Sequence, residues 1–160
     1  MCGIGLLLSS DKVERKFLQE IGNLFISSLE SRGPNDKGLW INEHENLCIC
    51  HTRLSIQGLD SFSSQPMFSS KKNWLIAYNG EVYNKKLLRN QLYLKNGKDI
   101  NFKGNSDTEI LVEYIQEFGI DAAINSIEGM FSLIAYNIDQ KKLFFCGDRF
   151  GEKPLYFGKI

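Results

Sequence analysis

The sequence predicts an α+β fold in which two antiparallel sheets are stacked and helices lie outside them. Apolar runs of strand length outnumber the segments with helical spacing, and several are apolar on both faces, which indicates burial on both sides. The polar links at 42–46 and 137–142 have hairpin length, so the strands that they join are antiparallel. Antiparallel strands that are covered on both faces must be stacked, and helices in separate blocks then cover the outside.

The strand predictions rest on short apolar runs bounded by polar residues or glycine. In chain order they cover residues 3–8, 38–41, 47–51, 74–78, 130–136, 143–146 and 155–157. The four cysteines are too few and too oddly spaced for a disulfide framework, so we expect reduced thiols. Cys48, Cys50 and His51 could in principle share a metal, but without a C-x-x-C pair the better interpretation is a buried strand in which cysteine acts as a small core residue.

The first predicted helix follows the first strand. Its apolar residues recur every three or four positions over residues 13–28, after a capping box that Asp11 and Glu14 could form. The Arg-Gly-Pro sequence at 32–34 ends this helix, because proline cannot continue it.

Two further helices are expected in the second half of the chain. Ser106 with Glu109 three residues on is a typical helix start, and Gly119 lies where a C-terminal cap belongs. A shorter helix is predicted over residues 84–94.

Composition supports one folded domain over residues 1–160, since 42% apolar and 12% aromatic residues rule out a disordered chain. Repeats, low-complexity stretches and linker-like segments are absent from the sequence. The 19 basic and 19 acidic residues cancel, which argues against nucleic acid or an anionic membrane surface as a partner. With neither a bilayer-length apolar run nor the layout of a secretory signal, we expect a cytoplasmic protein.

Cys2 is a candidate nucleophile, because removal of Met1 would make it the first residue. An N-terminal cysteine supplies both a thiol and an α-amine, whose pKa of about 7.7–8.0 lets it act as a base at cellular pH. Taken alone, a cysteine at position 2 is better interpreted as incidental, so the assignment depends on the other residues that a catalytic pocket would need.

Asn79 and Gly80 follow the predicted strand at 74–78 and could present a side-chain amide and a backbone N–H in one direction. Two convergent donors of this kind form an oxyanion hole. An Asn-Gly pair after a strand is also a common tight turn, and in isolation the turn is the better interpretation.

Arg53 and Asp107 add two opposite charges. Arg53 ends a buried strand, where its guanidinium could bind a carboxylate or simply be solvated. Asp107 falls in the first turn of its helix, where it could accept an ammonium or only stabilise the helix dipole. With Cys2 and Asn79, these residues describe a pocket for an α-amino acid whose side-chain carbonyl is attacked.

Motifs follow one another along essentially the whole chain. In order they are Met-Cys-Gly-Ile at 1–4, Ser-Arg-Gly-Pro-Asn at 31–35, Arg-Leu-Ser-Ile at 53–56, Gln-Pro-Met at 65–67, Tyr-Asn-Gly-Glu-Val-Tyr-Asn at 78–84, Ser-Asp-Thr-Glu at 106–109, Glu-Gly-Met-Phe at 128–131 and Asp-Arg-Phe-Gly-Glu-Lys-Pro-Leu-Tyr-Phe at 148–157. This series resembles the class II glutamine amidotransferase domain, and within that class it is most similar to glutamine-hydrolysing asparagine synthetases.

The resemblance implies an N-terminal nucleophile hydrolase with a four-layer αββα sandwich, in agreement with the stacked sheets predicted above. It also implies that Cys2 is the nucleophile once Met1 is removed, and that the Asn79 amide and the Gly80 N–H hold the oxyanion. L-Glutamine would then pass through a glutamyl thioester to glutamate and ammonia. No cofactor or metal is expected in this domain, since ATP and magnesium would serve only a synthetase domain.

The same resemblance assigns the substrate pocket and the partners. Arg53 would bind the α-carboxylate of glutamine and Asp107 its α-amine, while Leu54, Ile56 and Glu81 would line the pocket. The partner would be a synthetase domain or subunit that uses the ammonia, and the sequence up to Ile160 does not contain one. A homodimer is left open.

One motif departs from the family pattern. Ser31 and Asn35 stand where the family usually has histidine and aspartate, so the hydrogen bonds of those two residues are in question, with Asp36 as a partial substitute.

Two other functions fit the same fold. One is a catalytically silent regulatory or assembly domain, which gives no physical reason to keep Cys2, Asn79, Arg53 and Asp107 together. The other is a hydrolase of a different amide, as in the conjugated bile salt hydrolases, which the pairing of Arg53 with Asp107 disfavours.

Overall fold

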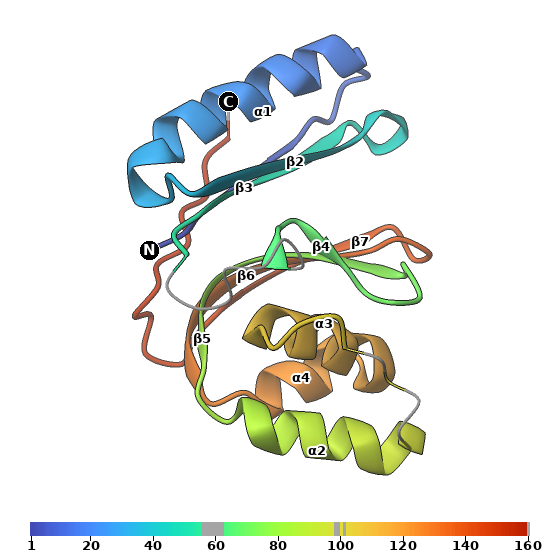
Figure 1. Ribbon diagram of the computed structural model, residues 1–160. Coiled ribbons are helices and arrows are strands. Elements are labelled where there is room, and N and C mark those ends of the chain that lie inside the picture. Colours follow the sequence, from blue (N-terminus) through green and yellow to red (C-terminus); the bar gives the residue numbers. More distant parts are fainter. Residues whose placement is uncertain (56–62, 98–99, 101, 160) are drawn as a thin grey trace.

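The computed structural model of the protein describes residues 1–55, 63–97, 100 and 102–159, and it confirms the stacked sheets. Helix α1 (Arg15–Leu29) covers a three-stranded sheet, which lies on a four-stranded sheet, and the remaining helices cover the far side (Figure 1). The named strands pair antiparallel throughout. The layer order is therefore the αββα order that the sequence resemblance implies.

The three-stranded sheet has the order β1-β3-β2, with β3 (Leu47–Arg53) between β1 (Gly3–Leu8) and β2 (Asp36–Asn42). Successive side chains of β3 alternate between α1 and the second sheet. Thr52 faces α1, where its Oγ1 donates to the Leu29 carbonyl oxygen at 3.1 Å. The strand is buried along its whole length, which explains why its sequence is apolar on both faces.

The cysteines of β3 behave as core residues, as the sequence predicts. Both Cys48 and Cys50 are fully buried, and burial, with a smaller contribution from Cys48, raises the pKa of the Cys50 thiol to about 12. A thiol with such a pKa stays protonated and is a poor metal ligand. Among the described residues, no group of three or more metal-binding side chains comes together.

The four-stranded sheet has the order β4-β5-β6-β7. Its strands are β4 (Met67–Phe68), β5 (Trp74–Val82), β6 (Gly129–Asn137) and β7 (Lys142–Gly147). The long central strands pair over nine positions, from Trp74 opposite Asn137 to Val82 opposite Gly129. In Figure 1, β5 bends at its end toward the helices below the sheet, which brings this end of the strand close to the helix layer.

Three helices cover the outer face of this sheet: α2 (Lys85–Asn96), α3 (Asp107–Phe118) and α4 (Ile120–Ser126) (Figure 1). The predicted caps of α3 are confirmed, since the Ser106 Oγ accepts the Glu109 N–H at 3.1 Å and Gly119 ends the helix. The predicted capping box of α1 is wrong, because its N-cap, Glu14, makes no side-chain cap bond. Short 3-10 turns at Glu30–Arg32 (η1) and Glu43–Glu45 (η2) follow α1 and β2.

Among the described residues, two apolar cores lie on the two faces of the four-stranded sheet. The core between the sheets is formed by the buried residues Leu47, Ile49, Leu75, Ala77, Ile134 and Tyr136. The larger core between the second sheet and the helices includes Ile76, Tyr78, Leu88, Leu111, Ile115 and Leu133. Alternate residues of β5 enter different cores, which is why its sequence lacks a polar face.

The strand predicted at 155–157 is wrong, because the described chain after β7 is irregular there. This segment passes from the second sheet toward α1 (Figure 1). Asp148 fixes its start, since its carboxylate accepts backbone N–H groups at 3.0–3.1 Å from Phe131, Phe150, Glu152 and Lys153. Burial opposes ionisation, but these hydrogen bonds outweigh it and hold the pKa of Asp148 at about 2. Within the described residues, no helix is both long and apolar enough to cross a membrane.

Candidate functional site

Strand alternation brings three of the predicted residues to the same end of the inter-sheet space. Cys2 precedes β1 in phase with Ile4, which packs against the inter-sheet core. Arg53 is in phase with Ile49 of β3, and it lies next to Thr52, the partner of the first residue of β1. Asn79 is in phase with the inter-sheet residues of β5. Side chains from both sheets therefore converge where β1 begins and β3 ends.

These residues border one pocket of about 150 Å³. It is lined by Met1, Cys2, Arg53, Leu54, Ser63, Gln65, Tyr78, Asn79, Gly80, Glu81, Ser106, Asp107, Thr108 and Met130. Sites for drug-sized ligands are typically about 300–1,000 Å³, so this pocket suits a smaller molecule such as an amino acid. Of the residues predicted from the sequence, only Ile56 is not placed, because it lies outside the described residues.

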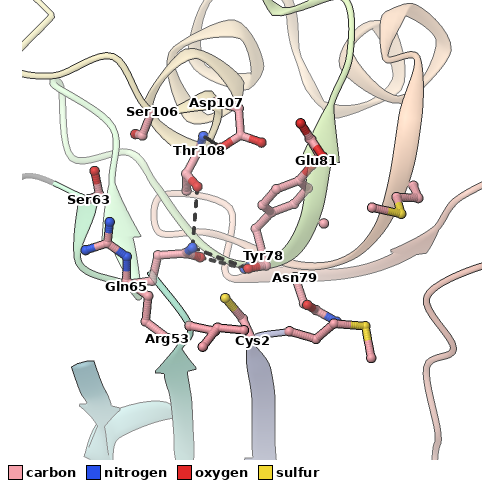
Figure 2. Close-up of a pocket in the computed structure, with 14 residues that line it drawn as sticks. Cys2, Arg53, Ser63, Gln65, Tyr78, Asn79, Glu81, Ser106, Asp107 and Thr108 are labelled. Atoms are coloured by element: carbon pink, nitrogen blue, oxygen red, sulfur yellow. Dashed lines mark hydrogen bonds between the residues drawn. The ribbon is translucent and has the colours of Figure 1, made fainter. Parts of the chain in front are cut away.

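Cys2 stands at the floor of the pocket. Figure 2 shows its sulfur pointing up into the space below Gln65 and Tyr78. The Asn79 side chain extends from β5 toward the N-terminal segment that carries Cys2. The Cys2 carbonyl oxygen accepts a hydrogen bond from Arg32 Nε at 3.3 Å, which ties the start of β1 to the turn after α1. The α-amine belongs to Met1, so cleavage after Met1 would place the new amine on the residue that carries the thiol.

Arg53 is held by the motif at 31–35. A Cβ on Gly33 would come within 2.6 Å of backbone atoms of Thr52 and Arg53, so only glycine allows this turn to lie against the end of β3. The Asn35 N–H donates to the Arg53 carbonyl oxygen at 2.9 Å, and the Asn35 Oδ1 accepts the Ser55 N–H at 3.0 Å. Asn35 therefore holds the backbone at the end of β3 through its own N–H and its side-chain amide oxygen.

Asp36 has a different partner. Its Oδ2 accepts a hydrogen bond from the Ser64 hydroxyl at 2.7 Å. Asp36 lies on β2 across from Arg53, the last residue of β3. The partial substitution by Asp36 stays a prediction, since Asn35 and Asp36 make separate contacts in this chain.

Asn79 and Gly80 lie inside β5 and not in a turn after it. They pair with Ser132 and Phe131 of β6, so the turn interpretation is wrong. A Cβ on Gly80 would stand 2.2 Å from the Met130 carbonyl oxygen, which means that only glycine permits this close approach of β5 to β6. Asn79 is thus presented from a paired strand, which holds its side chain more firmly than a loop would.

Asp107 comes from the N-terminus of α3. Its Oδ2 accepts the Val82 N–H at 3.1 Å and its Oδ1 accepts the Thr108 N–H at 2.9 Å, so the carboxylate joins the end of β5 to the helix. Burial raises the pKa of Asp107, while these hydrogen bonds act in the opposite direction. A partly buried carboxylate of this kind gains most from a cationic ligand.

Two supporting residues were missed by sequence reasoning. The Gln65 side chain accepts the Tyr78 N–H at 2.7 Å and donates to the Tyr78 carbonyl oxygen at 3.3 Å, and it also reaches the Thr108 hydroxyl at 3.4 Å (Figure 2). His51 of β3 contacts the same carbonyl oxygen through Nε2 at 3.3 Å. The Gln-Pro-Met motif was the available signal for Gln65. The residues that Gln65 contacts lie well outside this motif, so no local pattern links them to it.

Comparison with known proteins shows the family to which the chain belongs. The family model described as "Glutamine amidotransferase domain" matches residues 1–160. Asparagine synthetase B [glutamine-hydrolyzing] from Escherichia coli is 31% identical, over 99% of this chain and 27% of that protein. Asparagine synthetase [glutamine-hydrolyzing] 1 from Bacillus subtilis is 30% identical, over 100% of this chain and 24% of that protein.

Two other matches have lower sequence identity. Amidase chry2 from Gibberella zeae is 27% identical, over 98% of this chain and 24% of that protein. A solved glutamine phosphoribosylpyrophosphate amidotransferase from B. subtilis has a TM-score of 0.46 and 21% identity, over 70% of this chain and 24% of that chain. The chain spans about a quarter of the length of the curated relatives named here.

Proposed function

The chain belongs to the glutamine amidotransferase domain family, and from that premise we propose that it hydrolyses L-glutamine to L-glutamate and ammonia. The observation that carries the proposal is the convergence of Cys2, Asn79, Arg53 and Asp107 on one pocket of amino-acid size.

The two charges would fix the α-carbon of the substrate. Arg53, which is 8% exposed, would bind the α-carboxylate, and Asp107 would accept the α-ammonium. Leu54 and Glu81 border the same pocket and would complete its walls. With its α-carbon held at this end, glutamine would direct its side-chain amide toward Cys2.

The reaction would begin once Met1 is removed. The α-amine of Cys2 takes the thiol proton, and the sulfur attacks the amide carbon to form a tetrahedral adduct. The Asn79 amide and the Gly80 N–H donate to the oxyanion, and ammonia leaves with a proton returned from the α-amine. Water then attacks the resulting thioester, which releases glutamate and restores the thiol. Every step uses only the amide, water and residues of this pocket, so no metal or cofactor is required in this domain.

The ammonia would serve a second reaction. By analogy with the asparagine synthetases that the chain resembles, we expect a synthetase domain or subunit to bind ATP and magnesium and to activate an acceptor, of which aspartate is the family's commonest. We place this chemistry in the cytoplasm. A homodimer is compatible with the proposal but is not needed for it.

The test pairs mass spectrometry of the purified N-terminus with a glutamate-release assay on L-glutamine without ATP. Protein that lacks Met1 should release glutamate, Cys2→Ala should abolish the release, and Cys2→Ser should leave little, because a hydroxyl is a weaker nucleophile. Cys146→Ala is the matched control, since this half-buried thiol lies in β7 and does not line the pocket. Undiminished turnover in Cys2→Ala would remove the mechanism.

A further inference from the structure

Gln65 lies where the strand that neighbours β5 has ended. β4 pairs with β5 over only two positions, and extending that register by two residues places Gln65 opposite Tyr78, directly before Asn79. The Gln65 backbone does not make this pairing, because its carbonyl oxygen lies against β2, where a Cβ on Gly38 would stand 1.9 Å from it. Pro66, the next residue, has no N–H to donate. The edge of β5 beside Asn79 therefore needs another partner.

The Gln65 side chain takes the place of the strand backbone. A primary amide offers the same kinds of donor and acceptor as a peptide group. Its Oε1 accepts the Tyr78 N–H at 2.7 Å, and its Nε2 donates to the Tyr78 carbonyl oxygen at 3.3 Å. His51 of β3 provides a second donor to that oxygen, with its Nε2 also at 3.3 Å. Both polar groups of the Tyr78 backbone are thus held by side chains.

Holding the Tyr78 carbonyl group also holds Asn79. The peptide unit that links the two residues is planar, so the position of its carbonyl oxygen sets the plane that contains the Asn79 Cα. On the other edge of β5, Asn79 pairs with Ser132 of β6. Loss of the Gln65 amide would therefore leave Asn79 supported from one edge of its strand.

The Gln65 amide is itself anchored. The residue is 7% exposed, and its Nε2 also reaches Thr108 Oγ1 at 3.4 Å, near the start of α3 (Figure 2). Gln65 borders the pocket, but its amide oxygen and nitrogen are engaged with Tyr78 and Thr108. Its effect on the reaction is therefore transmitted through β5, the strand that carries Asn79.

We propose that Gln65 is a positioning residue for the oxyanion hole. Its side-chain amide replaces a strand neighbour and holds Asn79 and Gly80 in the direction that the tetrahedral adduct requires. The inference rests on the proposed function and adds to it a residue that acts through the oxyanion donors. Such donors stabilise the transition state more than they stabilise bound glutamine, so the effect falls on kcat.

The experiment measures steady-state glutamate release by the chain that lacks Met1, with and without Gln65→Met. Methionine is about as long as glutamine but lacks the amide donor and acceptor. A misplacement of about 1 Å can cost about 10²-fold in rate, so kcat should fall about 10- to 100-fold while KM stays within about twofold. Gln65→Glu should also lower kcat, because it keeps an acceptor for the Tyr78 N–H but sets a carboxylate oxygen against the Tyr78 carbonyl oxygen.

Gln116→Met is the matched control. The Gln116 side chain accepts a hydrogen bond from the Ser69 hydroxyl at 2.8 Å and does not line the pocket, so its replacement should leave kcat unchanged. A double-variant cycle adds a readout that a purely structural role would not move. If Gln65 acts through Asn79, Gln65→Met combined with Asn79→Ala should lose far less kcat than the product of the two single losses.

The function and the positioning role fail in different ways. If the wild-type chain that lacks Met1 releases no glutamate, the proposed function fails and takes this inference with it. If the wild type is active and Gln65→Met keeps its kcat, raises only KM, or multiplies in full with Asn79→Ala, the function stands and the role of Gln65 is wrong. Failure of both Gln65 variants to fold, or an equal loss of kcat in Gln116→Met, would assign Gln65 to the fold alone and refute the inference.

Discussion

His51 should make the stability of the fold depend on pH between about 6.5 and about 4. The side chain is 1% exposed, and its Nε2 lies 3.3 Å from the Tyr78 carbonyl oxygen. A carbonyl oxygen only accepts, so Nε2 carries the proton and the neutral ring makes this bond. Burial lowers the pKa of His51 from 6.5 to about 4, although the bond to Tyr78 and the charge of Asp36 act in the opposite direction.

The sign and size of the effect follow from linkage. The folded state holds His51 neutral, so its contribution is fully present above the pKa of the unfolded chain, about 6.5, and is lost as the pH falls toward about 4. At roughly 1.4 kcal/mol for each pKa unit, the free energy of unfolding should fall by about 3 kcal/mol over this window.

Urea unfolding at a series of pH values between 8 and 4 measures the effect. The difference between the wild type and His51→Gln removes the contributions of other titrating groups, including Glu113, whose pKa is raised by burial. The chain has two histidines, and His44→Gln is the control because His44 is exposed in the turn between β2 and β3. Parallel loss of stability in the wild type and His51→Gln would refute the reasoning.

Four further predictions concern the pocket and its frame. Asn79→Ala and Asn79→Asp should lower kcat by about 10²–10³ in steady-state assays with a smaller effect on KM, with the charged replacement worse, whereas an unchanged kcat in both would deny Asn79 an oxyanion role. Arg53→Ala and Asp107→Ala should each lower kcat/KM for L-glutamine by a factor of about 30 to a few thousand, since each leaves a substrate charge unpaired. D-Glutamine should be a poor substrate of the wild type, and similar kcat/KM values for L-glutamine, D-glutamine and glutaramate would favour a generic amidase. Asp148→Asn should lower the free energy of unfolding by about 2–4 kcal/mol in urea titrations, because an amide cannot accept all of the N–H groups that the carboxylate does; an unchanged value would assign those contacts no net stability.

Elements that bury a continuous apolar run were predictable from the sequence. The strands β1 and β3 match their predicted starts, because their residues are apolar wherever they contact α1 or the second sheet. β5 runs four residues beyond its prediction, since Asn79-Gly80 has the composition of a turn and only pairing with β6 keeps it extended. Such pairing joins residues about 50 positions apart, which no local pattern records.

The misses have equally local causes. The sequence did not predict α4, which spans only Ile120–Ser126 and follows α3 directly. Gly119 was interpreted as the end of α3, and the short segment after it gave no separate helical pattern. The predicted strand at 155–157 has the apolar residues of a strand, but Tyr156 and Phe157 are exposed, so the run has no sheet to bury it. In the pocket, charged and nucleophilic residues could be identified by their chemistry. The supporting roles of Gln65 and His51 could not be identified in this way, because both side chains contact the backbone of Tyr78.

The core between the sheets also sets the spacing between pocket residues that come from different sheets. Cys2 directly precedes β1 and Arg53 ends β3, whereas Asn79 belongs to the other sheet, so the distance between the thiol and the proposed oxyanion donor depends on how closely the two sheets pack. Ile49 and Ala77 are fully buried in that packing and are not among the residues that line the pocket. Because a misplacement of about 1 Å can cost about 10²-fold in rate, the volumes of such residues are constrained by catalysis as well as by folding. Substitutions that change the volumes of these core residues would misalign the pocket before they unfolded the protein.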